Sequence, residues 1–102
     1  MKVNNLMDLL DTSHDSDTTQ YFCDRIDSNL SGYEKVTNED TYWEETEFTK
    51  EELISMCNEL IMEHIHDTEW KEDFSDPTYS YEEFTKIYIN IIINFINIIL
   101  NY

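Results

Sequence analysis

Apolar residues recur with helical spacing at the start of the chain. Val3, Leu6, Met7 and Leu10 are related by steps of three or four residues, so they would share one helix face. The next segment, 11–17, is polar and rich in residues that favour turns and helix caps. The pattern predicts a short N-terminal helix that ends where this polar segment begins.

A second helix is predicted after the polar segment. Apolar residues occupy every fourth position from Phe22 to Leu30, which places them on one face of a helix. The side chain of Asp15 or Asp17 is the expected N-cap, because a carboxylate accepts bonds from unpaired backbone N–H groups there. Gly32, the only glycine of the chain, lies where a helix commonly ends.

A third helix is predicted at about 50–66, counting from its capping signals. Thr49 and Glu52 match a capping box, in which each residue bonds the backbone N–H of the other. Phe48 and Leu53 occupy the hydrophobic-staple positions around it. A 100° rotation per residue predicts an apolar face of Leu53, Cys57, Leu60, Ile61 and Ile65, and an acidic face of Glu52, Glu59, Glu63 and Asp67.

The pattern weakens between the second and third helices. Two segments of alternating character within 33–48 flank the turn-like residues 38–40. A short β-hairpin and an irregular acidic loop both fit this pattern, and the alternatives stay open.

The last residues, 87–102, carry no charge and contain four asparagines. A membrane-spanning helix needs about 20 apolar residues, and the asparagines and the lack of basic flanking residues count further against insertion. Strand-like alternation fails at Asn97. A helical period places all four asparagines in one stripe, and Ser80 with Glu83 supplies a capping box at the start of this helix. The stripe consists of Asn90, Asn94, Asn97 and Asn101.

The apolar arc of this final helix covers about 240° of its circumference, counting about 100° per residue. Such a helix is expected at the centre of a small, mainly α-helical bundle formed by a single domain, 1–102. Three short helices would leave part of it uncovered, so a homodimer through this helix is an alternative. The asparagines would then be either a solvated edge or cross-bonds that fix the register between chains. The core or oligomer series is Phe84, Tyr88, Ile91, Phe95 and Ile98, continued by Tyr102.

The charge of the chain indicates which kinds of partner the protein could bind. With 23 acidic and six basic side chains, the net charge is −17. Such a field repels nucleic acid and anionic membranes and attracts basic partners. Solubility alone calls for a net charge of about 2–8 in magnitude, so the excess favours a binding role. No direct nucleic-acid or membrane contact is expected.

Neither a cofactor nor catalysis is expected from the residues. Two isolated cysteines, Cys23 and Cys57, and the lack of a secretory leader predict reduced thiols and a cytoplasmic location, in the host cell if the protein is viral. His64 and His66 would point about 200° apart on a helix, which favours a packed His64 and a solvated His66 over a metal site. The many carboxylates share one acidic environment, whereas catalytic pairs need distinct ones.

The candidate partner-binding residues are therefore acidic clusters interleaved with aromatic side chains. On the third helix, Glu59 and Glu63 would be about 6 Å apart along the axis, a distance on the scale of the phosphate spacing of DNA. Aromatic side chains among them would anchor an interface. These residues are Tyr42, Trp43, Glu44, Glu45, Glu47, Glu51, Glu52, Glu59, Glu63, Asp67, Glu69, Trp70, Glu72, Asp73 and Asp76.

In size and charge the whole chain resembles the DNA-mimic inhibitors of phages and mobile elements, namely the anti-restriction and anti-CRISPR proteins. This resemblance implies a non-enzymatic inhibitor that blocks a nuclease or a CRISPR or restriction effector by occupying its DNA-binding channel. The segment 76–81, DPTYSY, is similar to the tyrosine pair beside a proline in nuclease-bacteriocin immunity proteins, with a different order and spacing. That similarity implies an alternative function, neutralisation of a nuclease toxin.

Overall fold

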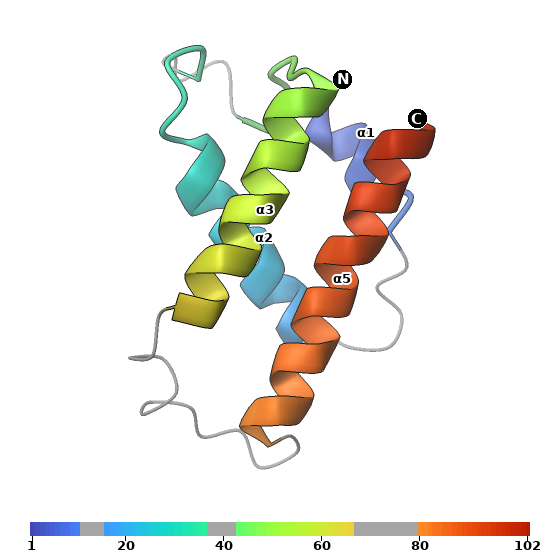
Figure 1. Cartoon of the computed structure of the whole chain (residues 1–102). Helices are drawn as coiled ribbons and strands as arrows, with labels where there is room; N and C mark the ends of the chain where they lie inside the picture. The colour runs from blue at the N-terminus through green and yellow to red at the C-terminus, as the bar shows by residue number, and fades with distance from the viewer. Residues whose placement is uncertain (11–15, 37–42, 67–79) are drawn as a thin grey trace.

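The computed structural model is a helical bundle in which the C-terminal helix packs on the other three (Figure 1). The structure describes residues 1–10, 16–36, 43–66 and 80–102. Within these ranges 74% of the residues are helical and none belongs to a strand, which confirms the predicted mainly α-helical bundle. The helices are α1 (Val3–Met7), α2 (Ser16–Leu30), α3 (Lys50–His66) and α5 (Tyr81–Asn101).

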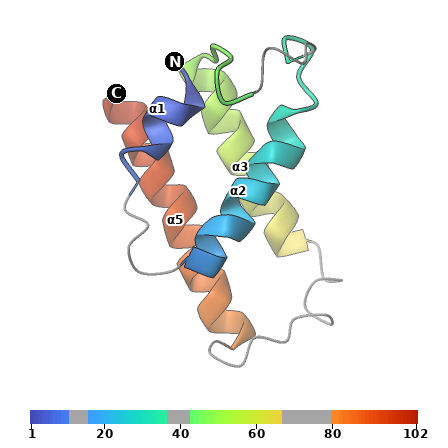
Figure 2. The ribbon, with the colours of Figure 1, turned by 180° about the vertical axis from the view of Figure 1, so that it is seen from behind.

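The helices form two layers. Helices α3 and α5 lie side by side, and α2 crosses behind both of them (Figures 1 and 2). Helix α1 packs on α5 near its C-terminal end, so both chain ends are at the same end of the bundle. Helix α5 therefore contacts each of the other described helices.

Local signals account for the two N-terminal helices, with corrections at the ends of α2. Val3 and Leu6 of α1 are fully buried, as their spacing predicts. Helix α2 begins at Ser16, so Asp17 lies inside its first turn and is not the N-cap. The other predicted cap, Asp15, lies outside the described residues. Gly32 follows the helix without a left-handed φ, because the N–H groups of Gly32 and the next residue bond carbonyls three positions back.

Helix α3 has the predicted bounds and the predicted capping box. The backbone N–H of Thr49 donates to the Glu52 carboxylate at 2.9 Å, and that of Glu52 donates to the Thr49 hydroxyl at 3.1 Å. Phe48 and Leu53, the staple pair, are both buried. These bonds satisfy two backbone donors at the point where α3 has to begin.

The buried face of α3 is rotated from the predicted one. Its core positions include Met56 and His64 as well as the predicted Leu53, Cys57 and Leu60. Ile61 is half-buried, and Ile65 was predicted wrongly, because it is 56% exposed. The reason is that α3 contacts both α2 and α5, so its buried face points at the junction between these two helices.

Helix α5 begins after Ser80, whose hydroxyl accepts the Glu83 backbone N–H at 3.2 Å. By length and composition α5 is the one helix in the described part of the chain that could also cross a membrane. All four asparagines of the predicted stripe are exposed, which confirms the polar stripe. Its buried residues are Phe84, Tyr88, Ile92, Phe95 and Ile99.

In the predicted core or oligomer series of α5, Phe84, Tyr88 and Phe95 are buried, whereas the other three residues are not fully buried. Ile91 and Ile98 are only partly buried at the edges of the core, and Tyr102 is 56% exposed. Ile92 and Ile99 are fully buried in their place. Because the helix has isoleucine at both alternatives, its own sequence does not decide the rotation. The rotation of α5 is set instead by the positions of α2 and α3, on which it packs.

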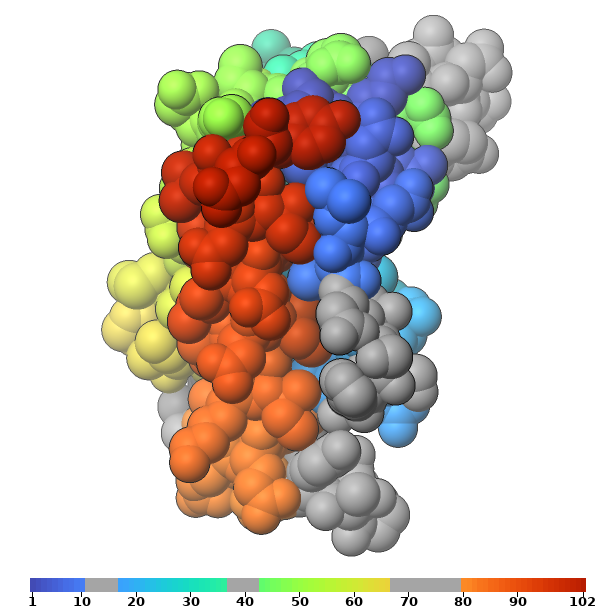
Figure 3. Space-filling view, turned by 90° about the vertical axis from the view of Figure 1, so that its right-hand side faces the viewer, coloured from blue at the N-terminus to red at the C-terminus, as the bar shows by residue number. Residues whose placement is uncertain are grey.

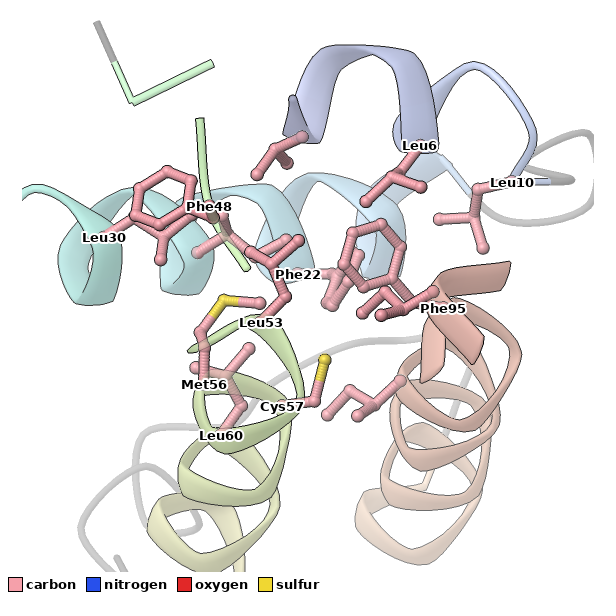
Figure 4. Close-up of a cluster of buried hydrophobic side chains, with 14 of the residues drawn as sticks. Leu6, Leu10, Phe22, Leu30, Phe48, Leu53, Met56, Cys57, Leu60 and Phe95 are labelled. Carbon is pink, nitrogen blue, oxygen red and sulfur yellow. The ribbon is translucent and has the colours of Figure 1, made fainter. Parts of the chain in front are cut away.

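Aromatic side chains occupy the centre of the bundle. The rings of Phe22 on α2 and Phe95 on α5 meet edge to face with centroids 5.5 Å apart (Figure 4). Tyr88 contacts the rings of Tyr21 and His64 at 4.9 and 4.7 Å. Edge-to-face pairs of this kind add to the stabilisation from buried area. They join α2, α3 and α5 in one cluster.

The described parts of 33–48 form turns instead of strands. Residues 37–42, which include the predicted turn, lie outside the described residues. The extended pairing in this region is a single antiparallel bridge between Lys2 and Glu47. It joins the segment before α3 to the N-terminus, not to residues 33–36.

The rotation of α5 predicts a difference between neighbouring isoleucines. Ile92→Ala should lower the free energy of unfolding by about 2–5 kcal/mol, the usual cost of truncating a buried isoleucine. Ile91→Ala should cost clearly less, because that side chain is only partly buried. Urea denaturation followed by circular dichroism measures both variants. An equal or larger loss for Ile91→Ala would contradict the observed core face.

Candidate protein-interaction surface

The structure describes about half of the predicted partner-binding residues. Trp43 and seven glutamates are described, and they lie between residue 43 and the C-terminal half of α3. Outside the described residues are Tyr42, Asp67, Glu69, Trp70, Glu72, Asp73 and Asp76, together with the first four residues of the DPTYSY motif.

The predicted acidic face of α3 points at α2 and is largely paired with it. Arg25 donates to Glu63 at 2.8 Å, and the Asn29 amide donates to Glu59 at 3.0 Å. Beyond the end of α2, Lys35 donates to Glu52 at 2.6 Å. These contacts line or flank an open groove of about 610 Å³ between the two helices. The glutamates expected to mimic phosphates therefore hold α2 against α3.

A second set of predicted glutamates holds the N-terminus. The Met1 ammonium lies 2.7 Å from the Glu47 carboxylate and also donates to the Phe48 carbonyl. The hydrogen bond from this ammonium, followed by its charge, lowers the pKa of Glu47. Lys2 pairs with Glu45 at 3.5 Å. Both glutamates thus connect the segment before α3 to the start of the chain.

A further group of carboxylates lies along the outer side of α2. Asp17, Asp24 and Asp27 are exposed and lie opposite the buried apolar face of this helix. Glu44 directly follows Trp43, whose indole N–H donates to Asp27, so Glu44 lies near this part of α2. Burial, followed by the charges of Asp24 and Glu44, raises the pKa of the Cys23 thiol. No Lys or Arg in the described residues forms an ion pair with any of these four carboxylates. We call Asp17, Asp24, Asp27 and Glu44 the acidic α2 face.

Trp43 connects this face to the core. Its indole N–H donates to the Asp27 carboxylate, and its half-buried ring packs against the core. The indole therefore positions the segment that carries Glu44 against α2. Its predicted role as an interface anchor remains a prediction, restricted to the part of the ring that is exposed.

Sequence reasoning did not select the three aspartates of the acidic α2 face. The usable signal was their spacing of seven and three residues, on the side opposite Phe22 and Leu30. The predicted partner-binding residues came instead from the longer glutamate clusters. Whether those glutamates pair with basic residues depends on how the helices pack.

The histidines are placed as predicted. His64 is 3% exposed, and its Nε2 atom is 3.1 Å from the Thr85 hydroxyl, whereas His66 is exposed. Within the described ranges no group of three or more His, Cys, Asp or Glu side chains could hold a metal ion. Cys57 is free and buried, and burial raises its pKa to about 12. This thiol is therefore weakly reactive at neutral pH.

Comparisons with known protein families, with curated proteins and with solved structures found no match to this chain.

Glu52 provides a test of the paired carboxylates. The hydrogen bond from Lys35, followed by that from the Thr49 backbone, lowers the pKa of Glu52 below its ordinary value of 4.5. Its contribution to stability is therefore complete above pH 4.5 and is lost as the pH falls through the lowered, folded-state pKa. Glu52→Gln should destabilise the protein at neutral pH, and its difference from the wild type should shrink in acid.

Glu51→Gln is the matched control for this prediction. It removes the same charge from the same helical turn, and Glu51 has no ion pair with a described residue. Urea denaturation at a series of pH values measures the free energy of unfolding of all three proteins. An equal loss for both variants at neutral pH would contradict a specific role for the Glu52 contacts.

Proposed function

We propose that this protein is a non-enzymatic inhibitor that binds a basic, nucleic-acid-handling protein through the acidic α2 face. The observation that carries this proposal is the convergence of Asp24, Asp27 and Glu44 from two segments without a described basic partner. The other predicted glutamates that are paired with a basic or amide group hold elements of the bundle together. The uncompensated carboxylates are those with charge available to a partner.

Electrostatics support a partner of opposite charge. A net charge of −17 draws basic surfaces towards the protein and raises their association rate. A basic channel that normally holds nucleic acid would release its bound counterions on meeting this face, as it does on meeting DNA. Sequence-independent attraction of this kind needs charge density more than a particular motif.

The spacing on α2 supports DNA as the ligand that is mimicked. Asp24 and Asp27 differ by about 4.5 Å along the helix axis, and Asp17 lies about 10 Å further back. The phosphates of one DNA strand advance by about 3.4 Å per nucleotide. The carboxylates therefore lie on the same length scale as phosphates, and the helix holds them at fixed separations.

Binding experiments with charge-matched variants test the proposal. The partner is first captured on the immobilised protein from host lysate, identified by mass spectrometry and purified. A triple variant, Asp24→Asn with Asp27→Asn and Glu44→Gln, should weaken its binding roughly tenfold or more, the effect of about 1.4 kcal/mol. The asparagine at position 27 keeps an oxygen for the Trp43 indole.

The control removes three charges elsewhere. Asp8→Asn with Glu34→Gln and Glu82→Gln changes exposed residues outside the acidic α2 face and should retain most of the affinity. Binding of the wild type should weaken steeply with salt and compete with duplex DNA. Simultaneous binding of DNA and this protein to the partner, or equal losses for both triple variants, would contradict the proposal.

A further inference from the structure

Helix α5 has a second ordered face, opposite the one that it buries. Asn90, Ile93, Asn97 and Leu100 are all exposed, with Ile93 at 45% and Leu100 at 54%. Figure 3 shows the surface of α5 extending along the molecule, with α1 and α3 on either side of its C-terminal part. We call these four residues the α5 seam.

The α5 seam has the spacing of a coiled-coil interface. Its steps of three, four and three residues are those of alternating a and d positions in a heptad repeat. The asparagines occupy both a positions, and Ile93 and Leu100 occupy the d positions. The buried residues Ile92, Phe95 and Ile99 fall at c and f, on the opposite side of the helix. One helix thus carries a core face and a seam.

Apolar surface continues from the α5 seam onto the turn that follows α1. Leu9 is 60% exposed and Tyr102 is 56% exposed. With Asn97, Ile98 and Asn101 they line an open hollow of about 290 Å³ at the end of α5. The side chains that extend the seam are therefore apolar or amide-bearing, and none is charged.

The charge distribution restricts which partner this surface fits. Residues 87–102 carry no charge in a chain of net charge −17. A basic partner would be attracted to the carboxylates in preference to this seam. A second copy of the same chain is repelled by every acidic surface, so the uncharged seam is the surface through which it can approach. Charges separated by more than a Debye length, about 8 Å at physiological salt, are then largely screened.

We propose that the α5 seam binds the α5 seam of a second copy of this chain in a parallel homodimer. The parallel arrangement places Asn90 against its counterpart and Asn97 against its counterpart, so the amides bond each other and fix the register. Ile93 and Leu100 likewise pack on their counterparts. An antiparallel pair would set the amides against aliphatic side chains and leave them without bonds.

The same amides argue against a lipid bilayer as the occupant of this surface. Inserting α5 would place the exposed asparagines in hydrocarbon, which is costly for polar groups.

Sedimentation equilibrium of the whole chain tests the dimer. The mass should rise from 12.3 kDa towards twice that value with increasing protein concentration. Added salt should strengthen the association, because it screens repulsion between two acidic chains. Ile93→Glu with Leu100→Glu should keep the mass at that of the monomer. Met62→Glu with Ile65→Glu adds the same charge at exposed positions of α3 and should leave the dimer intact.

Disulfide trapping tests the orientation. In a Cys23→Ser background, Asn97→Cys should form a cross-linked dimer under mild oxidation, because parallel a positions are close enough for a disulfide. Ser55→Cys, exposed on α3, should remain monomeric under the same conditions. Circular dichroism of each variant confirms that the helices are retained.

Three outcomes would overturn the proposal. The first is a monomeric mass at all concentrations and salt conditions. The second is a dimer that survives both seam substitutions or is not trapped by Asn97→Cys. The third is flotation of the wild type with neutral phosphatidylcholine vesicles in place of self-association, which would assign the seam to a membrane. None of these results depends on whether the acidic α2 face binds a basic partner.

Discussion

The burial of one side of α5 is the constraint on which the rest of this structure depends. Tyr88 and Phe95 of this helix contact aromatic rings from α2 and α3, and α1 covers its C-terminal part. Most apolar side chains of α2 face this core, which leaves its outer face acidic, whereas α3 also exposes Met62 and Ile65. A chain with so much negative charge can fold in this way because its core-forming residues are concentrated in one nearly uncharged segment.

Three of the six basic side chains link segments that are distant in sequence. Arg25 and Lys35 connect α2 and the following turn to α3, and Lys2 connects the N-terminus to the segment before α3. Individually such exposed pairs contribute little to stability. Their placement nevertheless decides which carboxylates are neutralised. The paired glutamates lie between elements, whereas the four carboxylates of the acidic α2 face have no ion pair with a described basic residue.

Local signals in the sequence predicted the helices better than their rotation. The bounds of α3 could be predicted because Thr49 and Glu52 cap it through bonds within four residues. Whether Ile91 or Ile92 is buried could not be predicted, because both are apolar and the outcome depends on where α2 and α3 pack. For the same reason the sequence did not predict the pairing of Glu63 with Arg25, which is 38 residues away. The proposed partner-binding surface therefore lies on α2, whereas the sequence predicted one that includes α3.

The two proposed surfaces lie on different sides of the bundle, so use of one would not block the other. The acidic α2 face is behind the α3–α5 layer, and the α5 seam is at the edge of that layer (Figures 2 and 3). A parallel pair would therefore carry two acidic α2 faces in a fixed relation. Two linked faces would bind a target with two basic sites more tightly than one face, because the second contact becomes intramolecular. Self-association would thus increase the effect of the charge while leaving every carboxylate of the acidic α2 face exposed.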